Sequence, residues 1–143
     1  MVTRLHEFLI ATLLFSLATP AITIADEHRD SAERPAKWLS ESGAYTVSFT
    51  SSVQPIEINR IHEWIVHIET EEGDPVENAE ITIEGGMPAH NHGMPTAPRV
   101  TEYLGDGDYR AKGLRFHMQG EWQMTIGIDD GSVSDSVIIN LQL

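Results

Sequence analysis

The stretch that decides the fold is WQMTIGIDDGSVSDSVIINLQL, residues 122–143. Apolar side chains occupy every second position at its start, at Trp122, Met124, Ile126 and Ile128. Alternation of period two places one face of a strand in a core and the other face in water. Asp130-Gly131 is a turn signal, and a second run follows it to Leu143. The stretch therefore predicts two consecutive strands joined by a turn.

Shorter runs of the same kind lie upstream, separated by turn signals such as Gly73-Asp74-Pro75. These runs cover residues 45–49, 64–68, 79–83, 100–104 and 109–114. About seven short strands with turns about every 8–12 residues are typical of a β-sandwich, and no stretch has a helical period. We therefore expect an all-β protein, an immunoglobulin-like antiparallel β-sandwich of about seven strands, over residues 43–143.

One turn carries a finer signal. Leu104-Gly-Asp-Gly-Asp-Tyr109 is similar to the tyrosine corner of immunoglobulin-like sandwiches, in which a tyrosine hydroxyl bonds to nearby backbone. The alternative is a generic Gly-Asp turn that precedes an ordinary strand tyrosine.

The N-terminus has the pattern of an export signal. Residues 8–18, FLIATLLFSLA, are uncharged, and Thr23-Ile24-Ala25 offers small residues for cleavage. We expect a signal peptide over residues 1–25, a flexible lead-in over 26–42, and a periplasmic or secreted protein with no membrane insertion after cleavage. The alternative is an inner-membrane anchor through residues 8–25, which is barely long enough to span a bilayer.

Composition excludes several partners and sites. The 143 residues suit one domain. The chain has 22 acidic and 9 basic residues, a net charge of −13, which repels phosphate backbones and argues against nucleic acid as a partner. The absence of cysteine excludes disulfides and thiolate metal sites.

The segment that breaks the alternation is GGMPAHNHGMPTAP, residues 85–98, where prolines and glycines argue against a regular strand or helix. It holds Met87, His90, His92 and Met94. Two histidines at i, i+2 in an extended segment project to one side, with Cα atoms about 6.6 Å apart. Imidazole suits copper and zinc, whereas thioether selects Cu(I). The sequence therefore predicts a metal site, and His117 or Met118 can add a ligand.

Other features point away from catalysis. His62 and His67 are spaced i, i+5 within a strand, so they face opposite sides and do not form a zincin motif. No serine lies in a nucleophile-elbow context. We expect no enzymatic activity. The alternative to metal binding is a structural loop, with methionines filling the end of the sandwich.

An ordered set of motifs resembles the YtkA-like domains, small exported bacterial β-sandwiches related to the FixH accessory proteins of cytochrome oxidase assembly. The motifs are Asp74-Pro75-Val76-Glu77-Asn78-Ala79, Met87-Pro88-x-His90-x-His92-Gly93, Gly107-x-Tyr109 and Met118-x-Gly120-x-Trp122, within residues 46–141. The resemblance implies copper handling or metalloenzyme maturation, with His90, His92 and Met118 at the motif positions that meet a metal. His117 has no counterpart in the pattern. FixH-like members usually keep a membrane anchor, and the cleavable leader predicted here departs from that.

Together these features predict a periplasmic copper-binding or copper-delivery protein. Cu(I) is the favoured ion, with Cu(II) and zinc as alternatives, and the partner is a metalloenzyme or an oxidase assembly factor. The alternative function is a metal-free interaction domain that docks on a membrane or secreted complex.

Overall fold

The computed structural model describes residues 35–143. The expected signal peptide, residues 1–25, and residues 26–34 of the expected lead-in lie outside this part of the chain. Within residues 35–143 no helix is both long enough and apolar enough to cross a membrane. The choice between a cleaved leader and an anchor therefore stays a prediction.

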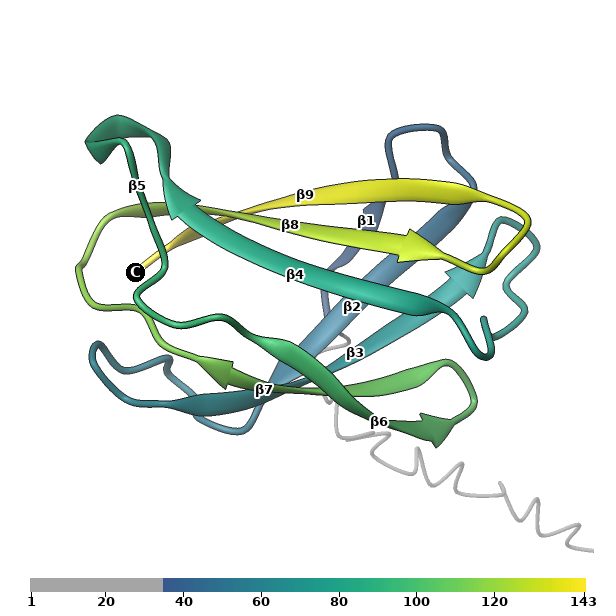
Figure 1. Ribbon diagram of the computed structural model, residues 1–143, viewed down its shortest axis with the longest axis horizontal. Coiled ribbons are helices and arrows are strands. Elements are labelled where there is room, and N and C mark those ends of the chain that lie inside the picture. The colour runs from purple at the N-terminus through teal and green to yellow at the C-terminus, as the bar shows by residue number, and fades with distance from the viewer. Residues whose placement is uncertain (1–34) are drawn as a thin grey trace, which may run out of the picture. The chain divides into compact units, whose positions relative to one another are not determined.

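Residues 35–143 form two antiparallel sheets (Figure 1). One sheet has the strand order β1-β2-β3-β7-β6, and the other has the order β5-β4-β8-β9. The strands are β1 Lys37–Leu39, β2 Tyr45–Ser51, β3 His62–Thr70, β4 Glu80–Met87, β5 His92–Gly93, β6 Arg99–Gly105, β7 Asp108–Leu114, β8 Glu121–Asp129 and β9 Ser134–Gln142. A 3-10 helix, η1 (Pro88–His90), links β4 to β5. The expected all-β antiparallel sandwich is confirmed, and the strands beyond the expected seven are the short β1 and β5.

The core lies between the sheets and follows the alternation in the sequence. Trp64, Val66 and Ile68 of β3 are fully buried, as are Trp122 and Met124 of β8. The polar residues between them face outward, because successive side chains of a strand point to opposite faces. The strands supply most of the core, and Val76 and Phe116 from the connections between strands complete it.

Strand β1 corrects the expected boundary of the lead-in, because it lies within residues 26–42. Its three residues pair with β2, Trp38 opposite Val47. The Trp38 ring stacks on Phe49 with centroids 5.5 Å apart, and Phe49 stacks on the buried Trp64 at 4.0 Å. Aromatic stacking across three strands therefore fixes a segment whose sequence has no strand period.

The tyrosine of the Gly-Asp turn does not make the expected local bond. The Tyr109 hydroxyl donates to the Val76 carbonyl at 2.9 Å and accepts from the Ala79 N–H at 3.1 Å. The local bond belongs to Tyr103, whose hydroxyl accepts from the Gly107 N–H at 3.3 Å. Tyr109 instead ties the β3–β4 loop to β7.

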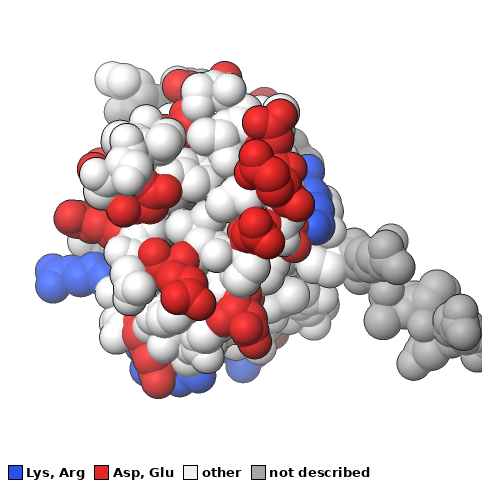
Figure 2. All heavy atoms as spheres, turned by 90° about the vertical axis from the view of Figure 1, so that its right-hand side faces the viewer, with Lys and Arg blue, Asp and Glu red and all other residues white. Residues whose placement is uncertain are grey.

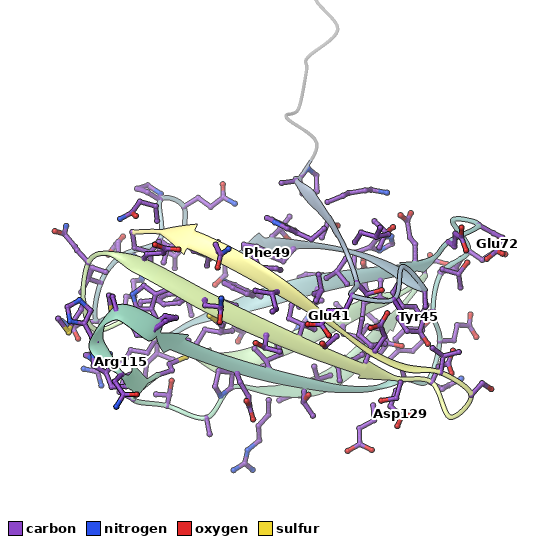
Figure 3. The ribbon with its side chains drawn as sticks, turned by 90° about the horizontal axis from the view of Figure 1, so that it is seen from above. Glu41, Tyr45, Phe49, Glu72, Arg115 and Asp129 are labelled. Atoms are coloured by element: carbon purple, nitrogen blue, oxygen red, sulfur yellow. The ribbon has the colours of Figure 1, made fainter. Side chains whose placement is uncertain are left out.

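The two ends of the sandwich differ in charge. Figure 2 faces the end that holds the β3–β4, β6–β7 and β8–β9 turns, and acidic side chains cover much of it. The exposed acidic residues in and beside these turns include Glu71, Glu72, Asp74, Glu77, Glu80, Asp106, Asp129 and Asp130. In Figure 3, Glu72 and Asp129 lie at this end and Arg115 lies at the opposite end. The segment with the predicted metal ligands is at the Arg115 end, away from the acidic turns.

Candidate metal site

The segment expected to be irregular is a hairpin that extends the four-stranded sheet. Strand β4 continues through the glycines to Met87, and β5 returns beside it with His92 opposite Met87. Pro88 opens the 3-10 helix, where a missing backbone N–H costs no hydrogen bond. Asn91 then reverses the chain in the left-handed region, with φ 52°. The prolines and glycines therefore shape a tight turn rather than preventing regular structure.

Three imidazole rings meet at this end of the molecule. The centroids of His90 and His92 lie 5.8 Å apart, and those of His92 and His117 lie 4.9 Å apart. His90 and His92 do come together, but through the turn at Asn91 and not through an extended segment. His117 comes from the β7–β8 loop. The family motifs contain no counterpart of it, so the family resemblance did not predict that it joins this cluster.

Trp122 forms the floor below these rings. It is fully buried, and it forms edge-to-face pairs with His117 and His92, with ring centroids 5.4 Å and 6.3 Å apart. Its Nε1 donates to the Met118 carbonyl at 3.0 Å, which holds the loop that carries His117. The sequence predicted that Trp122 is a core residue. The spacing of residues along the chain did not predict that its ring contacts two histidines.

One nitrogen at the site has no partner. The Nδ1 atom of His117 is buried and has no hydrogen bond within residues 35–143. Buried polar atoms usually have partners, so this atom is unusual. In an imidazole ring, one nitrogen can bind a metal or a proton while the other makes the hydrogen bond. Nδ1 of His117 makes no hydrogen bond within residues 35–143.

Two of the predicted methionine ligands pack their methyl groups beside glycines. Met87 is 1% exposed, and its Cε occupies the space beside Gly120, 2.9 Å from where a β-carbon would lie. Met94 is partly buried against the core, and its Cε lies 2.8 Å from the corresponding position at Gly85. Met118, in contrast, is 38% exposed and is the accessible thioether among the predicted ligands.

The histidines are gathered but do not form a finished cage. Within residues 35–143 no three His, Cys, Asp or Glu side chains are arranged to hold a metal ion. His90 is exposed at the hairpin tip, where its ring can rotate. Beside His92 lies a groove of about 400 Å³, lined also by Glu84, Asn91 and Gln123. A metal ion can reach the histidine cluster from solvent through this groove.

The resemblance carried by the ordered motifs extends to a longer match with one protein family. The sequence pattern of the YtkA-like family matches residues 39–127. The chain belongs to the YtkA-like family. The matched part of this YtkA-like domain runs from the last residue of β1 into β8 and includes the hairpin and the His117 loop. No curated protein and no solved structure matches the chain.

Proposed function

We propose that this YtkA-like domain binds one copper ion outside the cytoplasm through His90, His92 and His117. The observation that carries the proposal is the grouping of three imidazole rings, with centroids 5.8 Å apart for His90 and His92 and 4.9 Å apart for His92 and His117. The last two rings also lie against the buried Trp122. Imidazole is a good ligand for copper and for zinc. The hairpin tip supplies an exposed ring, and the loop beside Trp122 supplies a partly buried one.

The oxidation state depends on the thioether. Met87 is 1% exposed, and the methyl groups of Met87 and Met94 fill space beside glycines. Met118 is the accessible soft donor, and it directly follows His117 in the chain. We infer that Met118 biases the site toward Cu(I), whereas the imidazoles by themselves bind Cu(II) or zinc.

Copper titration of the purified protein tests the site. We expect one ion per chain in the parent and loss of tight binding in His90→Ala/His92→Ala, with His117→Ala weakened as well. Met118→Leu keeps the volume and removes the sulfur, so it is the matched control. It should lower Cu(I) affinity while leaving Cu(II) affinity close to that of the parent. Circular dichroism and the thermal midpoint show whether each variant keeps its fold.

A second candidate function is supported by the packing of the methionines. Met87 and Met94 both occupy space beside glycines, as expected of a structural end-cap in an interaction domain that docks on a membrane or secreted complex. If the double histidine variant binds copper as tightly as the parent, this second function is favoured. Delivery of copper to a metalloenzyme or an oxidase assembly factor is the physiological role that we propose for the metal-binding form.

A further inference from the structure

The outer face of the five-stranded sheet carries a row of polar residues that crosses four strands. The strand register places Lys37 opposite Ser48, Ser48 opposite His67, and His67 opposite Asp108. Glu69 lies on the same face, two residues after His67 on β3. None of these residues belongs to the hairpin, so a site here does not depend on the proposed copper site.

Both nitrogens of the His67 ring face carboxylate oxygens. Nδ1 lies 2.7 Å from Oδ1 of Asp108, and Nε2 lies 3.3 Å from Oε1 of Glu69. An ionised carboxylate only accepts hydrogen bonds, so the 2.7 Å contact places a proton on Nδ1. In a neutral ring Nε2 then has a lone pair that faces an anionic oxygen. A positive species between Nε2 and Oε1 removes this repulsion.

The spacing of Nε2 and Oε1 favours a metal ion over a proton. A charge-assisted N–H···O bond has its heavy atoms about 2.7–2.9 Å apart, which is shorter than the 3.3 Å seen here. A zinc ion about 2.05 Å from nitrogen and about 2.1 Å from oxygen, at a tetrahedral angle, separates its two ligands by about 3.4 Å. The observed separation is close to this edge of a coordination tetrahedron.

The surroundings leave room and charge for a cation. Lys37 donates to Oε2 of Glu69, so the other oxygen, Oε1, faces His67. The hydrogen bond from Lys37 is the largest cause of the lowered pKa of Glu69. A recess of about 310 Å³ lined by these residues, Phe49 and Ile65 gives space for water ligands.

We propose that Nε2 of His67 and Oε1 of Glu69 bind a divalent cation of the zinc class, with water completing the coordination. Asp108 holds the ring through Nδ1, the arrangement in which a carboxylate orients a metal-bound histidine. With two protein ligands the site is weaker than a three-histidine site. Lys37 opposes the cation by charge while fixing the second carboxylate oxygen.

Zinc titration followed by the imidazole ¹⁵N signals of His67 tests this site. The full chain with His90→Ala, His92→Ala and His117→Ala prevents uptake at the hairpin. If that variant does not fold, the parent chain serves, because the signals report His67 individually. We expect zinc to shift the Nε2 signal while Nδ1 keeps its proton.

Variants separate the roles of the neighbours. Glu69→Gln should weaken zinc binding more than about tenfold, and Asp108→Asn about tenfold, the usual effect of losing an orienting carboxylate. Lys37→Met should strengthen binding, since it removes a repelling charge. A merely structural ion-pair network does not produce this gain. If zinc leaves Nε2 unchanged and only lowering the pH shifts it, that nitrogen holds a proton alone and the proposal is wrong.

Discussion

Replacing Tyr109 with Phe removes one oxygen atom from a buried junction. The ring is 2% exposed, and its hydroxyl connects β7 to the carbonyl of Val76 and the N–H of Ala79. The phenylalanine ring fills nearly the same space, so packing of the core changes little. The substitution therefore isolates the two hydrogen bonds that tie the β3–β4 loop to the sheet.

The expected loss follows from the groups left without partners. A typical hydrogen bond contributes about 0.5–1.5 kcal/mol, and a buried polar group left unpaired costs about 1–3 kcal/mol. Val76 is 4% exposed, so its carbonyl would become a buried polar group without a hydrogen-bond partner. We expect Tyr109→Phe to lower the free energy of unfolding by about 2–4 kcal/mol. Tyr103→Phe is the matched control, because its hydroxyl makes one longer bond, 3.3 Å to Gly107, and should cost about 0.5 kcal/mol.

Urea unfolding with a chelator present measures both variants without a contribution from bound metal. With a slope of about 1.5 kcal/mol per molar, a loss of about 3 kcal/mol lowers the midpoint by about 2 M. The Tyr103 variant should unfold within about 0.5 M of the parent. Equal midpoints for Tyr109→Phe and the parent, or a larger loss in Tyr103→Phe, would refute the role given to the Tyr109 hydroxyl.

Two further predictions concern alkaline stability and export. Burial, with the negative charge of nearby Asp130, raises the pKa of Tyr45 from 10.0 to about 12. The folded state therefore keeps this proton where the unfolded chain loses it, so the free energy of unfolding should be constant below pH 10 and fall as the pH rises toward 12. Denaturant titrations across this range measure the fall, which should be smaller in Tyr45→Phe. For export, mass spectrometry of the periplasmic fraction should give Asp26 as the first residue. An intact Met1 terminus in the membrane fraction would favour the anchored form instead.

The histidine cluster was partly predictable. His90 and His92 are close in sequence, and two such residues in a loop without carboxylates already indicated a metal site. His117 was uncertain because nothing local links it to the hairpin. Its ring reaches His92 because β8 pairs with β4, and Trp122 on β8 supports both rings. The His67–Glu69–Asp108 arrangement was also missed, since the register of β3 and β7 brings Asp108 opposite His67.

The sequence alone determined the all-β sandwich and its core, because a period of two is a local property that a strand expresses wherever it lies. It also determined that residues 85–98 depart from that period. Only the tertiary structure shows where the methyl groups of the methionines there pack. In the sequence, a methionine that binds a metal looks the same as one that fills space in the core. Met87 fills space beside Gly120, which lies on a distant segment, and Met94 meets Gly85 because the hairpin folds back on itself. The same holds for β1, since its three residues have no period of their own. The strand is held by Trp38 on Phe49 and Phe49 on Trp64, contacts that form only when three strands are side by side.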